Sequence, residues 1–76
     1  MKKIQILGPG CVKCKKLLEN AKKAAEEKGL VYQLEKIEDF REIMKMGVMM
    51  TPAIAIDGEV KSMGKVLSVE EIKNLL

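Results

Sequence analysis

Residues 4–14 of the chain read Ile-Gln-Ile-Leu-Gly-Pro-Gly-Cys-Val-Lys-Cys. The apolar run at 4–7 is typical of a short, largely buried strand. Residues 8–10 interrupt that run, and the chain then takes up the spacing of an amphipathic helix. Cys11 and Cys14 are the only two cysteines of the chain. The stretch therefore predicts a pair of thiols at a strand-to-helix junction.

The remaining residues continue this alternation and predict the order β-α-β-α-β-β-α. The first βαβ unit should be parallel, and Asp57-Gly58 is a strong signal for an antiparallel hairpin. Ser68 and Glu71 have the spacing of a capping box at the start of the last helix. We expect strands at 4–7, 30–37, 53–56 and 60–63, and helices at 12–28, between Asp39 and Gly47, and after Ser68. The apolar stripes of these helices are expected at Cys14, Leu17, Leu18, Ala21 and Ala25, at Phe40, Ile43 and Met44, and at Val69, Ile72 and Leu76.

Length and composition indicate one small soluble domain spanning 1–76. The 76 residues are 47% hydrophobic and 33% charged, with a net charge of +3. One Tyr, one Phe and no Trp leave too few aromatic rings for base stacking, so we expect no nucleic-acid partner. The apolar run after Lys3 stops at Gly8, short of the roughly 7–15 residues that a signal peptide needs. We therefore expect a cytoplasmic protein without a membrane partner, and we separately expect a monomer.

The cysteine pair is suited to thiol–disulfide exchange. The positive end of a helix dipole and its unpaired N–H groups would favour the thiolate of Cys11, and Lys13 would add positive charge. Residues three apart on a helix have Cβ atoms about 5–6 Å apart, close to the roughly 3.5–4.5 Å of a disulfide. In the hypothesised mechanism, Cys11 attacks a substrate disulfide and Cys14 resolves the mixed disulfide. A soft-metal site, half of a zinc site and an inert pair remain alternatives for a lone Cys-X-X-Cys.

Two further features complete a pattern across the whole chain. Thr51-Pro52 stands directly before the third expected strand, and Gly64 directly follows the fourth. Together with the cysteine motif after the first strand, this order resembles the thioredoxin superfamily, and above all its small, glutaredoxin-sized members. The resemblance implies an α/β fold with a four-stranded mixed sheet flanked by three helices.

The resemblance also implies a site and partners. Pro52 would follow a cis bond and lie beside the two cysteines, where it would help to keep metals off the dithiol. The backbone of Thr51 would pair with an extended substrate segment, and Gly64 would allow close approach of that segment. With this fold, Met50 and Met49 would border the pair and contact partner proteins; the alternative is that both are core or loop residues without such a role. The implied activity is that of a protein disulfide oxidoreductase in electron transport, with no cofactor or bound metal, acting on disulfide-containing proteins and recharged by an unidentified reductase or thiol donor.

Some residues depart from the family pattern. Gly10 stands where typical thioredoxins have Trp before the motif, and Val12-Lys13 replaces Gly-Pro within it. The first strand offers only Gln5 where larger thioredoxins have a buried Asp. The main alternative function is a Cu(I) or Zn(II) module, because small copper chaperones also carry a Cys-X-X-Cys between a strand and a helix. Those domains end in a strand, whereas this chain is expected to end in a helix.

Overall fold

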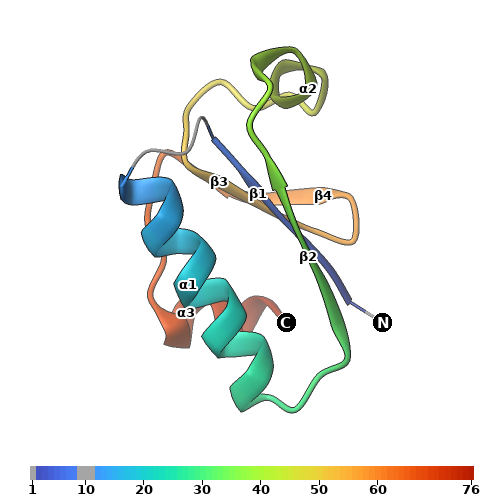
Figure 1. Cartoon of the computed structure of the whole chain (residues 1–76), viewed down its shortest axis with the longest axis vertical. Coiled ribbons are helices and arrows are strands. Elements are labelled where there is room, and N and C mark those ends of the chain that lie inside the picture. Colours follow the sequence, from blue (N-terminus) through green and yellow to red (C-terminus); the bar gives the residue numbers. More distant parts are fainter. Residues whose placement is uncertain (1, 9–11) are drawn as a thin grey trace.

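The computed structural model describes residues 2–8 and 12–76. Its elements follow the predicted order β-α-β-α-β-β-α (Figure 1). They are β1 (Lys2–Leu7), α1 (Val12–Glu27), β2 (Tyr32–Ile37), α2 (Phe40–Lys45), β3 (Ala53–Ile56), β4 (Glu59–Met63) and α3 (Val69–Leu75). The first strand begins two residues earlier than predicted and the second begins two residues later, while the other ends differ by about one residue.

The four strands form one mixed sheet in the order β2-β1-β3-β4. β1 runs parallel to β2, whereas β3 is antiparallel to both β1 and β4. In the β3–β4 turn, Asp57 and Gly58 have φ angles of 53° and 84°, the left-handed pair that a tight hairpin requires. The mixed α/β sheet with three helices is the fold that the family resemblance implies.

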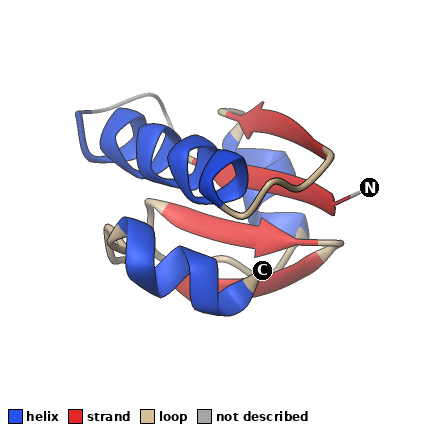
Figure 2. Ribbon diagram, turned by 90° about the horizontal axis from the view of Figure 1, so that it is seen from below, coloured by secondary structure: helices blue, strands red, loops and turns tan. Residues whose placement is uncertain are grey.

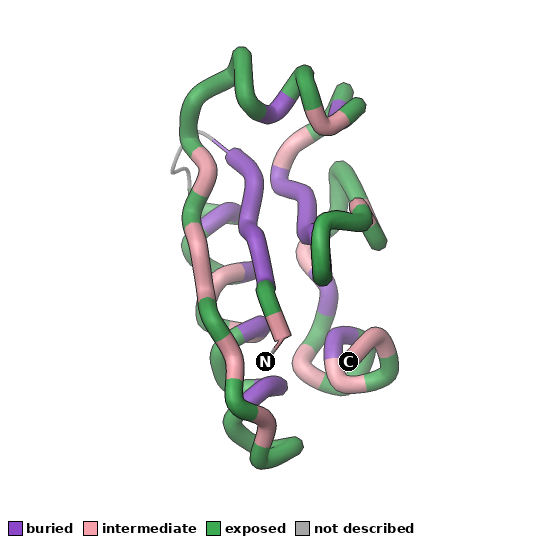
Figure 3. The backbone as a smooth tube through the Cα atoms, turned by 90° about the vertical axis from the view of Figure 1, so that its right-hand side faces the viewer, coloured by how far each residue is buried: buried purple, intermediate pink, exposed green. Residues whose placement is uncertain are grey.

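Alternation along the central strands gives the sheet two different faces. Ile4 and Ile6 of β1 point into the larger core cluster, under α1 and α3. Leu7 belongs to the smaller cluster on the other face, with Ile43 of α2. In Figure 2, α1 and α3 lie next to each other, and Figure 3 shows the central strands as mainly buried. The short α2 therefore packs against the second face through Ile43.

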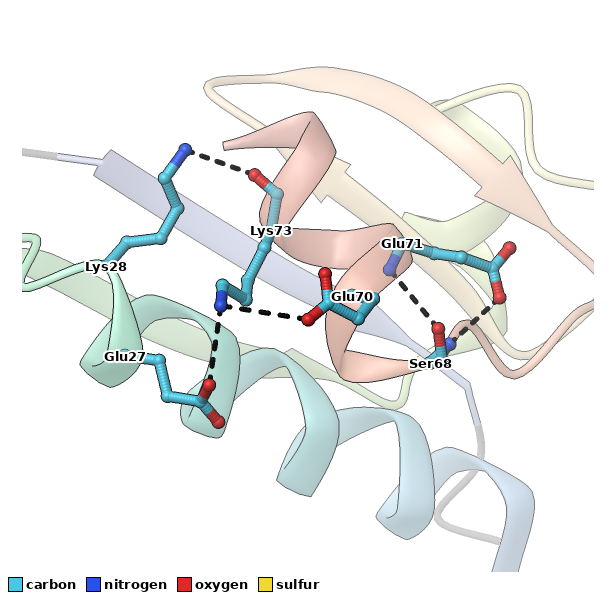
Figure 4. Close-up of polar contacts among 6 residues, drawn as sticks. All are labelled: Glu27, Lys28, Ser68, Glu70, Glu71 and Lys73. Atoms are coloured by element: carbon cyan, nitrogen blue, oxygen red, sulfur yellow. Dashed lines mark hydrogen bonds and ion pairs between the residues drawn. The ribbon is translucent and has the colours of Figure 1, made fainter.

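Local capping signals explain where the two short helices begin. The Asp39 side chain accepts a hydrogen bond from the Arg41 N–H at 2.8 Å, at the start of α2. At α3, the Ser68 Oγ accepts from the Glu71 N–H, and a Glu71 carboxylate oxygen accepts from the Ser68 N–H, both at 3.2 Å (Figure 4). The Lys73 ammonium also meets Glu27 of α1 at 3.4 Å. Both predicted caps are confirmed.

One predicted apolar stripe is wrong in part. Ile43 of α2 is buried, but Phe40 and Met44 are 57% and 70% exposed. The six-residue α2 contacts the sheet along a line too narrow to cover three of its side chains. The stripes of the longer α1 and of α3 are buried or half-buried, as predicted.

Candidate active site at one end of the sheet

The register of three neighbouring strands brings the predicted site residues to one end of the sheet. Leu7 of β1 is paired with Ala53 of β3, and Ala53 with Met63 of β4. β3 runs opposite to the other two strands, so the residue before Ala53 lies at the same end as the residues after Leu7 and Met63. Gly8, Pro52 and Gly64 therefore come together at one edge, although they are far apart in the sequence.

Cys14 occupies the first turn of α1 and points into this end of the fold. Its side chain is only 4% exposed. A Cβ atom added to Gly8 would overlap the Cys14 Sγ atom and would lie 3.7 Å from the Thr51 Cβ atom. Gly8 thus fits between Cys14 and Thr51, two residues that the sequence predicts for the site. Cys11 lies outside the described residues.

Gly8 is a site residue that the sequence pattern does not reveal. In the sequence it is only a residue that ends the first strand, yet in the structure it is buried and its N–H donates a hydrogen bond to the Ile37 carbonyl at 2.8 Å. Its lack of a side chain is required by the Cys14 sulfur, which lies six residues further along the chain. The available signal was a glycine directly after a buried strand and just before the cysteine motif.

The Thr51–Pro52 peptide bond is cis, as the resemblance implies. Pro52 is buried and its carbonyl accepts a hydrogen bond from the Gly64 N–H at 2.9 Å. Gly64 has a φ of +76°, and a Cβ atom there would lie 2.5 Å from the Met50 Cε atom and 3.2 Å from its Cβ atom. Four of the predicted binding residues, Met50, Thr51, Pro52 and Gly64, are therefore neighbours.

Lys13 also belongs to this end of the molecule. It lies beside Cys14 in the first turn of α1, and its side chain is exposed. That turn contains no acidic residue. The effect of Lys13 on the pKa of the thiols stays a prediction.

A pocket of about 460 Å³ adjoins the site. We call it the α2 pocket, because α2 and the loop that follows supply its walls. Thr51, which lies close to Gly8, forms part of its lining. Its lining residues are mostly apolar: Phe40, Ile43, Met44, Gly47, Val48, Met49 and Thr51.

The resolved pKa shifts fall elsewhere among the described residues. Hydrogen bonds from the Lys3 N–H and the Lys2 ammonium lower the pKa of Asp57, at the far end of the sheet. Hydrogen bonds from the Ser68 backbone and side chain lower the pKa of Glu71 in α3. These carboxylates stabilise elements of the fold.

Comparison with known proteins agrees with this geometry. A model of the thioredoxin domain family matches residues 2–76. The chain belongs to the thioredoxin domain family. The thioredoxin of Methanothermobacter thermautotrophicus is 46% identical over 76 residues, which are 100% of this chain and 99% of that protein. The thioredoxin of Methanocaldococcus jannaschii is 45% identical over 73 residues, covering 96% of this chain and 84% of that protein.

Membership of the thioredoxin family makes this protein a thiol–disulfide oxidoreductase that acts on protein disulfides. Within residues 2–8 and 12–76, no three His, Cys, Asp or Glu side chains come together as metal ligands. In the same part of the chain, no helix combines the length and the apolar character needed to cross a membrane.

Proposed function

We propose that Cys11 is the nucleophile of this oxidoreductase and that Cys14 is the resolving thiol. The observation that supports this most directly is the meeting of the Cys14 sulfur, Gly8 and Thr51 at the start of α1. A buried sulfur under the first helical turn is protected from outside disulfides, yet it is three residues from the other thiol. The more accessible position in such a pair is expected to attack first.

The proposed exchange transfers two electrons from the dithiol to the substrate. The Cys11 thiolate attacks one sulfur of a substrate disulfide, an S–S bond forms between them, and the other substrate sulfur leaves as a thiolate that takes up a proton. Cys14 loses its proton and attacks the Cys11 sulfur, which breaks the mixed disulfide and releases the second substrate thiol. The protein is left with a Cys11–Cys14 disulfide, and a reductase or thiol donor restores the dithiol.

The other site residues would act on reactivity and on substrate position. The N-terminal end of α1 and the charge of Lys13 would stabilise the Cys11 thiolate. The backbone of Thr51 would pair with an extended substrate segment next to Pro52, while Gly64 and Met50 would contact the same segment. The hydrogen bond between Gly64 and Pro52 supports their common role, because it joins the two sides of this surface.

We further propose that the protein works as a cytoplasmic monomer, without a cofactor or bound metal. Its substrates would be disulfide-containing proteins. The electron donor is a reductase or a small thiol, and a redox titration in glutathione buffers will show which donors have a sufficient potential.

Trapping experiments test the assignment of the two thiols. Cys14→Ser should accumulate a covalent complex with a test protein whose single cysteine is carried as a mixed disulfide with 5-thio-2-nitrobenzoate, which leaves on attack, because the resolving thiol that would release the complex is gone. Cys11→Ser should accumulate much less, and intact-protein mass spectrometry distinguishes the two. The reverse pattern would show that the roles are exchanged. Sub-nanomolar binding of Cu(I) or Zn(II) by the reduced protein, without insulin reduction, would favour the metal-module alternative.

A further inference from the structure

Exposed apolar side chains gather at the active-site end of the described structure. Phe40, Met44 and Met49 line the α2 pocket and are 57%, 70% and 91% exposed. Val31, also strongly exposed, is an exception that lies before β2, at the opposite end of the sheet. A cluster of large apolar side chains around one pocket indicates a surface that becomes covered by a partner.

The α2 pocket is continuous with the proposed substrate path. Thr51 forms one of its walls and also lies against Gly8, beside the Cys14 sulfur. A segment paired with the Thr51 backbone would therefore place a neighbouring side chain over the pocket. Its volume of about 460 Å³ lies within the roughly 300–1,000 Å³ that is typical of mainly apolar ligand-binding clefts. The two pocket methionines have flexible, polarizable side chains that adapt to different apolar shapes.

The charge at the start of α1 narrows the choice of partner. Lys13, Lys15 and Lys16 are exposed, and no acidic residue precedes Glu19 on this helix. None of these lysines forms an ion pair with another described residue. Positive charge at a helix N-terminus opposes the helix dipole and costs stability. By contrast, α3 begins with Glu70 and Glu71 and places Lys73 in its last turn.

We propose that the preferred substrate is a protein segment with a large apolar residue next to its disulfide cysteine and an acidic residue on the other side. The apolar side chain enters the α2 pocket, and the acidic side chain faces Lys15 and Lys16. This inference rests on the proposed function, because it describes the substrate of the same thiols. It adds a preference among protein substrates that the exchange chemistry by itself does not produce.

Four short peptides test this selection. Each carries one cysteine as a mixed disulfide with 5-thio-2-nitrobenzoate, flanked on one side by leucine or alanine and on the other by glutamate or lysine. The reduced protein releases the coloured thiol and the peptide thiol, and becomes the Cys11–Cys14 disulfide. Stopped-flow absorbance gives a second-order rate constant for each peptide. The set of four is made in both orders of the flanking residues, so eight peptides are prepared, and the four of the faster order are analysed.

The leucine peptides should react about tenfold faster than the alanine peptides, as expected for an apolar pocket that recognises a few methylene groups. Phe40→Ala and Met44→Ala should bring this ratio close to one. Val31→Ala is the matched control, since it removes a similarly exposed apolar side chain far from the pocket and should leave the ratio unchanged. Because leucine and alanine peptides meet the same thiols, the ratio does not depend on thiol reactivity.

The glutamate peptides should react several-fold faster than the lysine peptides at low ionic strength. This preference should largely disappear at about 1 M salt, where exposed charges are screened beyond roughly 3 Å. A Lys15→Gln, Lys16→Gln double variant should lose it too, whereas Lys22→Gln, Lys23→Gln on the same helix should keep it.

The outcomes separate the two proposals. Fast but equal rates for leucine and alanine, or for glutamate and lysine, would overturn the proposed selection and leave the exchange mechanism intact. Rates no faster than those of free cysteine with all four peptides would count against the proposed function itself. A dimer in sedimentation that Phe40→Ala dissociates would show that a second copy covers the pocket, and would also overturn the inference.

Discussion

At the scale of single residues, the site depends on a missing side chain as much as on the side chains present. Gly8 has no positive φ that would require glycine, so its requirement comes from contact alone. The Cys14 sulfur occupies the space where any other residue would place its Cβ atom. The buried sulfur is in this way packed directly against the Gly8 backbone.

Replacement of Gly8 tests this packing. Gly8→Ala should lower the free energy of unfolding by about 1–3 kcal/mol, the usual range for overfilling a packed interior. It should also slow disulfide exchange, because either Cys14 or the end of β1 must move. Urea unfolding and insulin reduction measure the two effects.

Gly29→Ala provides the control for this prediction. Gly29 has a φ of +66° and no atom within 4 Å of an added Cβ atom. The substitution should therefore cost about 1–2 kcal/mol of backbone strain while exchange by the folded protein stays at the wild-type rate. Equal exchange by the Gly8 and Gly29 variants would contradict the role assigned to Gly8.

At the scale of elements, sequence signals that act within a few residues were reliable. The Asp39 cap, the Asp57-Gly58 hairpin and the Ser68–Glu71 capping box all depend on neighbours along the chain, and the structure contains each of them. The order of the elements followed from the same signals. The fold was therefore largely predictable.

Features that depend on distant segments were harder to predict. The helical spacing of Phe40 and Met44 gave no sign that the sheet would leave them exposed. The contact between Gly8 and the Cys14 sulfur, and the contact between Gly64 and Met50, arise only when strands pair in register. The family resemblance supplied the grouping of Thr51, Pro52 and Gly64, which periodicity by itself does not contain.

The capping box of α3 allows a prediction for this element. Ser68→Ala removes the acceptor for the Glu71 N–H and should cost about 0.5–2 kcal/mol of stability. Ser62→Ala, in β4 and without a side-chain hydrogen bond among the described residues, is the control and should cost less. Thermal unfolding followed by circular dichroism measures both. Equal losses would show that the cap contributes little.

The same box predicts a dependence on pH. The hydrogen bonds from Ser68 lower the folded-state pKa of Glu71 below 4.5, its ordinary value. The unfolded chain then binds the proton more tightly, so this contribution is present above pH 4.5 and is lost as the pH falls through the folded-state pKa. Glu71→Gln should make stability less sensitive to acid in this range. Urea titrations at several pH values between neutral and strongly acidic conditions measure how steeply the free energy of unfolding depends on pH. The same dependence in Glu71→Gln and in the wild-type protein would contradict the prediction.

At the scale of the whole molecule, stability rests mainly on the larger core cluster. A domain of 76 residues has a free energy of unfolding of roughly 4–11 kcal/mol at the usual value per residue. Leu17 is fully buried between α1 and the sheet, whereas Leu18 is only partly buried. A single cavity in this cluster therefore removes a large share of the total.

Two adjacent leucines make this testable. Leu17→Ala should cost about 2–5 kcal/mol and leave a measurable unfolded population at 37 °C. Leu18→Ala makes the same leucine-to-alanine change at the next position. It should lower the free energy of unfolding clearly less, because part of the Leu18 side chain is already exposed to water. Chemical denaturation with tyrosine fluorescence and circular dichroism provides both values. Equal losses in the free energy of unfolding for the two variants would show that Leu17 and Leu18 contribute equally to stability, against this prediction.

Lys2 and Leu76, the first and last described residues, lie away from the Cys14 thiol. Lys2 begins β1 at the end of the sheet opposite Gly8, and Leu76 follows α3, whose Lys73 contacts Glu27 in the last turn of α1 and Lys28 just after it (Figure 1). A tether or fusion partner attached at either terminus would therefore leave the reactive edge facing outward. An immobilised form on an electrode or a resin should keep its full rate of turnover with large protein substrates.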